Sequence, residues 1–275
     1  MNPHTAHSLS PRMAATSIIK NRSLIYSLTR REVIGRYRGS AMGLLWSFFN
    51  PLLMLVIYTF VFSVVFKARW AGGSDSKTEF ALVLFAGLLV FNILAENLNR
   101  APGLILANVN YVKKVIFPLE ILPIVIMLST IFHFMISFFV WFIFYLIFFG
   151  IPHVSITELP IILLPLLLLT LGVSWFLASL SVYLRDVGQV IGVIVTVLMF
   201  LSPIFFPVSS MPEKYQPFMQ ISPLTFAVEQ ARNVMIWNRP VNWMSWIVWM
   251  LIASVTAWLG FAWFQKTRKG FADVI

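Results

Sequence analysis

Long apolar segments are the feature that most restricts how this chain can fold. Residues 44–66 form a run of 23 residues without a charged side chain. As an α-helix this run is about 34 Å long, which is enough to cross a hydrocarbon core of about 30 Å. Over the whole chain 59% of residues are hydrophobic and 11% are charged, which excludes a water-soluble domain. The sequence therefore predicts an all-α polytopic membrane protein.

Six segments are apolar and long enough to be predicted as transmembrane helices. Pro51 lies in the first half of the first segment and should kink that helix. Residues 1–16 are polar and aperiodic, so they are predicted to be a flexible cytoplasmic tail, and residues 17–275 to form a single transmembrane domain. The predicted spans are 44–66, 80–98, 117–149, 161–184, 187–206 and 243–264.

The segment before the first span combines positive charge with an apolar stripe. Residues 18–38 place apolar side chains on one side of a helix and several arginines on the other, which predicts an interfacial helix lying along the membrane. Gly35, Gly39 and Gly43 follow one another at a spacing of four. On a helix this spacing predicts a stripe that another helix can approach closely.

The 36 residues between the fifth and sixth spans do not read as a simple loop. Ser210 followed by Glu213 is a capping-box pattern, and Ser222 followed by Pro223 places proline at the first position of a helix. Two short helices are therefore predicted, and they are too short to span the membrane, which favours re-entrant or interfacial elements. Their approximate ranges are 211–220 and 223–237.

The distribution of lysine and arginine predicts the orientation of the chain. With a cytoplasmic N-terminus, the cytoplasmic segments hold 14 of these residues and the external segments hold 6. Both termini are therefore expected in the cytoplasm. The net charge of +10 comes from the flanks of the spans, so insertion bias explains it better than nucleic-acid binding does.

Motifs for catalysis are missing from the sequence. The chain has no Gly-Lys dipeptide, so it cannot supply the phosphate-binding loop of an ATPase. It also has no cysteine, and its four histidines are too scattered to suggest a metal site. His133 is the one histidine inside a predicted span; it is either a neutral residue hydrogen-bonded between helices or part of a proton relay. No enzyme activity, cofactor or metal is expected in this chain.

Four stretches resemble a known family of membrane proteins. They are RREVIGRYRGSAMGLLWSFFNP at 30–51, YVKKVIFPLEILP at 111–123, RDVGQVIGVIVTVLMFLSPIFFP at 185–207 and SPLTFAVEQAR at 222–232. Together they resemble the type-2 ABC transporter permeases that export polysaccharide such as O-antigen, capsule or teichoic acid. The resemblance covers the chain from about Thr29 to the C-terminus and departs in detail at Met42 and Leu119.

This resemblance implies a function and a set of partners. It implies the permease subunit of an exporter that moves a lipid-linked (polyprenyl pyrophosphate) polysaccharide such as O-antigen across the bacterial inner membrane, as part of lipopolysaccharide biosynthesis. It also implies a homodimer that pairs with two copies of a separate ATPase, which binds ATP and Mg. The alternative is a permease of the same fold for a lipid or a small-molecule drug. An intramembrane enzyme and a structural subunit without transport are two further classes, and the shortage of paired ionisable residues argues against the enzyme.

The resemblance also implies two conformational elements. A coupling helix that contacts the ATPase is expected within 99–116, with Asn108, Tyr111, Lys113 and Lys114 as its candidate residues; a positive loop that only fixes topology is the alternative. External gate helices are expected within 208–237.

Two groups of residues are candidates for substrate contact. Arg36, Tyr37 and Arg38 lie at the cytoplasmic membrane surface, where guanidinium groups suit the pyrophosphate of a lipid carrier, although they could simply anchor the chain to anionic lipid. Sugars stack on aromatic rings, so a glycan channel could be lined by Trp46, Phe49 and Tyr58. Packing inside the bundle is the alternative for these aromatic residues.

Overall fold

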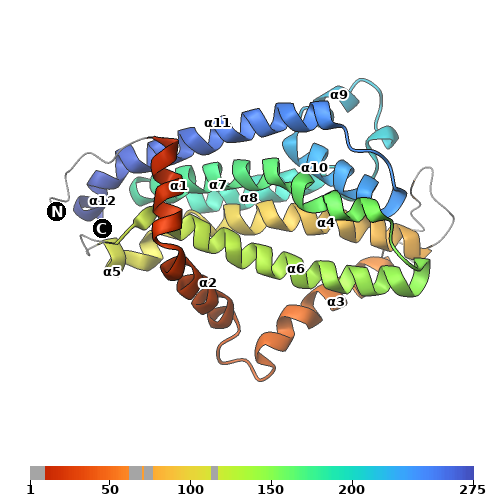
Figure 1. Ribbon diagram of the computed structural model, residues 1–275, viewed down its shortest axis with the longest axis horizontal. Helices are drawn as coiled ribbons and strands as arrows, with labels where there is room; N and C mark the ends of the chain where they lie inside the picture. The colour runs from red at the N-terminus through yellow and green to blue at the C-terminus, as the bar shows by residue number, and fades with distance from the viewer. Residues whose placement is uncertain (1–9, 62–69, 71–76, 113–116) are drawn as a thin grey trace.

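The computed structural model describes residues 10–61, 70, 77–112 and 117–275. Over these residues the chain is helical and contains no strand. The long helices lie side by side in an elongated bundle, and the first and last helices, α1 (Pro11–Lys20) and α12 (Phe271–Val274), lie at the same end of it (Figure 1).

Five helical stretches are long and apolar enough to cross a membrane: Gly43–Val61, Thr78–Arg100, Leu119–Phe149, Val154–Tyr183 and Trp243–Val274. They match the predicted first, second, third, fourth and sixth spans, except that residues 62–66 of the first lie outside the described residues. The helices within them are α3 (Trp46–Tyr58), α4 (Lys77–Arg100), α6 (Leu122–Phe149), α7 (Leu159–Tyr183) and α11 (Trp243–Thr267).

The helix observed in the fifth predicted span is shorter than the apolar segment from which it was predicted. Helix α8 (Val187–Leu201) has 15 residues, about 22 Å, and the chain leaves the helix at Ser202. Ser202 has φ −97° and ψ 154° because it precedes Pro203, and a residue before proline is driven out of the helical region. The predicted helix over 187–206 is therefore wrong for its last five residues.

Helix α4 is the centre of the bundle and α3 lies at its edge. In the most apolar stretch of α4, 83% of residues are buried, whereas in the stretch that contains α3 only 6% are buried. Figure 1 shows α3 apart from the other long helices, joined to the bundle at its C-terminal end. An apolar helix that the chain itself leaves uncovered must face lipid or another protein.

Helices α7 and α11 cross in close contact at two glycines that the sequence analysis did not predict as a contact. A Cβ on Gly260 of α11 would lie 2.0 Å from the carbonyl oxygen of Gly172 on α7, so neither position has room for a side chain. The predicted stripe at Gly35, Gly39 and Gly43 is wrong. Gly39 and Gly43 adopt positive φ angles of 86° and 51° in a turn, and nothing lies within 4 Å of a Cβ at any of the three.

The predicted interfacial segment consists of two helices. Helix α1 already begins at Pro11, because Ser10 caps it by accepting a hydrogen bond from the Arg12 amide; the predicted tail is therefore wrong for residues 11–16. Helix α2 (Arg22–Arg36) follows a break at Asn21 and ends two residues before the predicted end at 38. The buried face of α2 packs on the N-terminal part of α6.

One ion pair joins three distant parts of the chain at the end that holds α1 and α12. Glu120, just before α6, accepts a hydrogen bond of 2.6 Å from Arg268, which follows α11. The same carboxylate accepts a hydrogen bond of 2.8 Å from Ser17 of α1. Both charged side chains are at most 14% exposed, so this contact fixes the N-terminal helix to the C-terminal part of the bundle.

The segment between α8 and α11 contains the two predicted short helices with changed bounds. Helix α9 (Gln216–Gln220) begins five residues later than the capping-box pattern at Ser210 predicted, because Met211 is extended (ψ 151°) before Pro212. Helix α10 (Pro223–Arg232) confirms the second prediction: the Ser222 hydroxyl caps it by accepting from the Thr225 amide. A π-helical turn, Asn233–Trp237, follows directly.

Candidate functional site: a polar cleft beside helix α4

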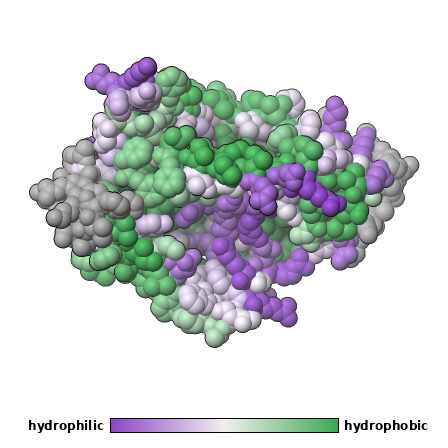
Figure 2. All heavy atoms as spheres, turned by 180° about the vertical axis from the view of Figure 1, so that it is seen from behind, coloured by the Kyte–Doolittle hydropathy of each residue, from purple (hydrophilic) through white to green (hydrophobic). Residues whose placement is uncertain are grey.

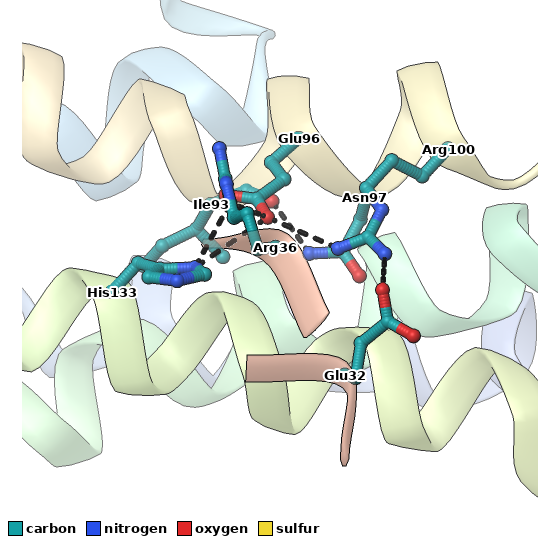
Figure 3. A network of polar contacts seen from close by, with 7 residues as sticks. All are labelled: Glu32, Arg36, Ile93, Glu96, Asn97, Arg100 and His133. Carbon is teal, nitrogen blue, oxygen red and sulfur yellow. Dashed lines mark hydrogen bonds and ion pairs between the residues drawn. The ribbon is translucent and has the colours of Figure 1, made fainter. Parts of the chain in front are cut away.

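Two arginines, two glutamates and a histidine form a connected network where the end of α2 meets α4 and α6 (Figure 3). Arg36 is the last residue of α2, Glu96 lies one turn before the end of α4, and His133 lies on α6. Arg36 is 60 residues from Glu96 and 97 residues from His133 in sequence. Only the packing of the three helices brings these groups together.

Arg36 is held by an acid and an imidazole at once. Its Nη1 lies 2.6 Å from Glu96 Oε1 and 3.0 Å from His133 Nδ1. The same Nδ1 lies 3.6 Å from Glu96 Oε1, so the tautomer of the ring decides whether it donates or accepts in this contact. The other ring nitrogen, Nε2, is buried and has no hydrogen-bond partner among the described residues.

A second arginine extends the network on its other side. Arg100 lies 3.3 Å from Glu96 on the same helix and also pairs with Glu32 of α2. Asn97, between them, donates to the Ile93 carbonyl at 2.8 Å instead of joining the ion pairs. The charges of the two arginines and the two glutamates alternate along the network and sum to zero. Arg36 is the most exposed member, at 43%, so it is the cation most accessible to a ligand.

The network forms part of the wall of an open cleft of about 420 Å³. The lining includes hydroxyl and amide side chains from three spans, which is unusual for a chain this apolar. A hydrophilic band reaches the middle of one face of the molecule, above the turn that joins α2 to α3 (Figure 2). Besides the ion network, the polar lining residues are Ser47, Asn50, Asn92, Asn99, Thr130 and Ser137.

The sequence carried a signal for this cleft that spacing could have revealed. On α4, Asn92, Glu96 and Asn99 recur at intervals of four and three, which places them on one face of the helix. On α6, Thr130 and Ser137 flank His133 at intervals of three and four. A polar stripe inside an otherwise apolar span indicates a face turned toward water or a ligand.

The three residues predicted to contact substrate at the membrane surface do not share one site. Arg36 and Tyr37 line the cleft, and the Tyr37 ring meets His133 edge to face with centroids 5.9 Å apart. Burial raises the pKa of the Tyr37 phenol above its usual value, so its hydroxyl remains a donor at neutral pH. Arg38 instead lines a separate groove with Arg30, on the far side of α2.

The predicted channel aromatics lie on α3 but are not among the residues that line the cleft. Trp46 is 39% exposed on the outer surface, and Phe49 packs edge to face on Phe48. Tyr58 is half-buried near the C-terminal end of α3.

The predicted coupling segment is partly described. It contains a 3-10 turn (Leu106–Asn108) followed by helix α5 (Val109–Val112). Tyr111 stacks on Phe117 at 4.2 Å, and the Arg31 guanidinium lies 5.8 Å from the Tyr111 ring. Asn108 donates to the Leu104 carbonyl at 2.9 Å, just before this turn. Lys113 and Lys114 lie outside the described residues. This segment thus contacts α2 five residues before Arg36.

The chemistry of the cleft is that of a binding site. It combines an exposed guanidinium with amide and hydroxyl groups that can hold an anionic or polyhydroxylated ligand. Within the described ranges, no group of three or more His, Asp or Glu side chains could hold a metal ion.

Comparison with known proteins gives relatives of similar length. The O-antigen export system permease protein RfbA of Myxococcus xanthus is 24% identical over 256 residues, which cover 92% of this chain and 96% of that protein. A Klebsiella pneumoniae protein of the same name is 24% identical, covering 92% and 95%. The polysialic acid transport protein KpsM of Escherichia coli is 22% identical, covering 94% and 98%.

The family comparison covers both the cleft and the segment around α10. Residues 23–236 match the family described as ABC-2 type transporter, and this range is most of the chain. Members of this family are membrane subunits that pair with an ATPase subunit, and they have no catalytic domain of their own. The chain is therefore a multi-pass membrane protein and a transport subunit, and it belongs to the ABC-2 type transporter family.

Proposed function

We propose that this chain is the permease of an exporter that moves a lipid-linked polysaccharide, carried on polyprenyl pyrophosphate, from the cytoplasmic leaflet of a bacterial inner membrane. The main support for the proposal is the cleft, in which Arg36 is accessible beside amide and hydroxyl groups within an apolar bundle. The relatives support the class of substrate, since they are named for the export of O-antigen and the transport of polysialic acid. An O-antigen, and hence a role in lipopolysaccharide biosynthesis, is the specific substrate proposed.

The proposed topology has six crossings and both termini in the cytoplasm. The excess of lysine and arginine in the segments assigned to the cytoplasm supports this orientation. The position of α1 and α12 at one end of the bundle agrees with it (Figure 1). In this topology α8 and residues 202–206 make the fifth crossing, α1 and α2 lie along the cytoplasmic surface, and α9 and α10 are short external gate helices.

The cleft recognises the carrier through its headgroup. Arg36 provides a guanidinium that can bond two phosphate oxygens, and Arg100 lies on the other side of Glu96 as a second cation. The lipid tail needs no pocket in the protein. Helix α3 borders the cleft and exposes an apolar surface to the bilayer, where the tail can remain. The pyrophosphate must displace Glu96 from Arg36, so binding opens the contact between α2 and α4.

In this proposal a separate ATPase supplies the energy for transport. Two copies of an ATPase, which bind ATP and Mg, act on a homodimer of this chain. They act through the segment that contains Asn108, Tyr111, Lys113 and Lys114. The contact between Tyr111 and Arg31 of α2 gives this segment a direct mechanical connection to the helix that ends at Arg36. Within the dimer, Trp46, Phe49 and Tyr58 of the uncovered helix α3 are the aromatic candidates for contact with the glycan.

The location of lipid-linked glycan in cells depleted of this protein tests the proposal. A glycan-binding probe is applied before and after the inner membrane is permeabilised. Glycan that accumulates only on the cytoplasmic side, and reaches the surface again when the wild-type gene is restored, is the expected result. Unchanged surface glycan in depleted cells contradicts the proposal and favours the lipid or drug permease.

A pair of matched variants tests the role of the cleft. Arg36→Gln should lower export at least about tenfold, since a hydrogen bond to a charged group contributes about 1.5–3 kcal/mol. Arg38→Gln, which removes a charge two residues away in the separate groove, should export normally. Equal loss in both variants, at equal membrane abundance, would mean that the arginines act only as a surface charge.

A further inference from the structure

A second cavity is lined by residues of α10 and of the segment that follows it. Figure 1 shows α10 away from the end of the bundle that holds α1 and α12. The volume of the cavity is about 270 Å³, just below the usual range of small-molecule sites, about 300–1,000 Å³. That volume suits one small ring better than an extended ligand. The residues that give its walls their chemistry are Trp70, Ser209, Glu229, Arg232, Asn233, Trp237 and Arg239.

One wall of this cavity is a buried arginine fixed by backbone groups. Arg232 is 1% exposed. Its Nε donates to the Val83 carbonyl at 2.9 Å, and its Nη2 donates to the Ile204 carbonyl at 2.8 Å. Its Nη1 donates to the Pro203 carbonyl. Three of its five N–H donors are used in this way, and two remain.

The residues around Arg232 leave room for its guanidinium group. A Cβ on Gly87 would lie 2.4 Å from Nη2, so only glycine leaves room for the guanidinium against α4. The Trp70 ring covers one face, 4.4 Å from Cζ. Among the described residues, no carboxylate lies within ion-pair distance of this guanidinium. Carbonyl dipoles therefore hold the cation in place without neutralising its charge.

Next to Trp70, the cavity lining contains a second pairing of a cation and an indole. Trp237 lies 6.4 Å from Trp70, and the Arg239 guanidinium lies 5.3 Å from the Trp237 ring. Arg239 is exposed, so this second charge stands at the mouth of the cavity. Glu229 is the acidic group of the cavity, and burial raises the pKa of its carboxyl above the usual value. Among the described residues that line the cavity, two arginines outnumber one glutamate, so this lining is positive.

The backbone around the cavity is irregular in a way that positions its polar groups. Asn233 and Trp237 begin and end a π-helical turn, a form found frequently at functional sites. Asn238, which follows, has a left-handed conformation with φ 49°, and the Arg239 amide donates back to the Asn233 carbonyl at 3.1 Å. This turn holds an amide, an indole and a guanidinium around one small space.

We propose that this cavity binds a single carboxylate-bearing sugar residue of a glycan as the chain leaves the permease. Arginine and carboxylate form charge-assisted hydrogen bonds, and the Asn233 amide, the Ser209 hydroxyl and the Glu229 carboxyl suit the ring hydroxyls. The Trp70 and Trp237 rings provide aromatic surface on which the apolar C–H groups of a sugar can pack. The proposal rests on the proposed export of polysaccharide and specifies an acidic residue in that polymer.

Sugar binding to the full-length protein tests this site directly. The purified chain is placed in nanodiscs of phosphatidylcholine, and saturation-transfer NMR is recorded with methyl glucuronide and with methyl glucoside. Saturation should reach the glucuronide and be at least fivefold weaker for the glucoside. Arg239→Gln should abolish the difference between the two sugars. Arg185→Gln, which removes an exposed arginine outside the cavity, should leave it unchanged.

Three results would overturn the assignment. They are equal saturation of the two sugars by the wild-type protein, an Arg239→Gln protein that still distinguishes them, and loss of glucuronide saturation when the nanodiscs contain phosphatidylglycerol. The last result would assign the site to an anionic lipid headgroup. The location of glycan in depleted cells separates this inference from the proposed function: normal surface glycan in those cells contradicts export, whereas absent glucuronide binding with intact export contradicts only this site.

Discussion

Glu96 is predicted to compete with the anionic substrate for Arg36. The carboxylate lies 2.6 Å from the Arg36 guanidinium, so a pyrophosphate can bind there only after this ion pair opens. Glu96→Gln keeps the shape of the side chain and removes its charge. The variant is therefore expected to bind a polyprenyl-type diphosphate more tightly than the wild type does.

The size of this effect follows from the exposure of the two partners. Glu96 is 17% exposed, but Arg36 is 43% exposed, so water screens the pair and its net contribution is about 1 kcal/mol. If binding must break the pair, removal of the charge should raise the affinity about fivefold. Arg100 keeps its contact with Glu32 in the variant, so the adjacent arginine is not left without a partner.

The measurement is the dissociation constant of farnesyl diphosphate for the purified protein in nanodiscs, determined by calorimetry. Glu32→Gln is the matched control: it neutralises the other carboxylate of the network, which contacts Arg100 and not Arg36, and should change the affinity less than twofold. Unchanged or weaker binding by Glu96→Gln would refute the reasoning, because Arg36 would then not be the group that receives the diphosphate.

Two further predictions concern the stability of the bundle. Gly260→Ala should lower the free energy of unfolding by about 1–3 kcal/mol, because its Cβ would meet the Gly172 carbonyl at 2.0 Å; thermal unfolding in detergent should show this, while Gly103→Ala, which has open space, changes little. Arg268→Gln should cost about 3 kcal/mol by leaving Glu120 buried without its cation, and the double variant that also carries Glu120→Gln should recover part of the loss. An unchanged unfolding temperature in either single variant would contradict the corresponding packing.

Several local features of the fold could be predicted because neighbouring residues encode them. A charge-free run such as 44–66 predicts a span whatever surrounds it, and five of the six predicted spans correspond to helices long enough to cross a membrane. Ser222 and Pro223 correctly predicted the start of α10. The errors at Ser202 and Met211 share a local cause as well, since each residue precedes a proline and is extended.

The candidate site was predicted only in part. Arg36 was singled out for its charge at the membrane surface and Tyr37 for its place beside it, and both line the cleft. Arg38 was grouped with them by adjacency, but it lines a different groove with Arg30 and Ile34, which lie on another face of α2 than Arg36. His133 was noted as a lone histidine; its contact with Arg36, 97 residues away, could not be read from the sequence.

Local sequence is enough to predict that this chain is a helical membrane protein, about where its spans begin, and which of the segments between them carry most of the positive charge. These properties depend on the transfer of each segment from water to hydrocarbon, which is a sum over neighbouring residues. Folding of the bundle is needed to bring Glu96 to Arg36 and Gly172 to Gly260, and to enclose Arg232 with carbonyls from α4 and from the segment after α8. These contacts depend on how each helix is rotated and shifted against its neighbours, and an apolar segment has the same hydropathy in every such arrangement.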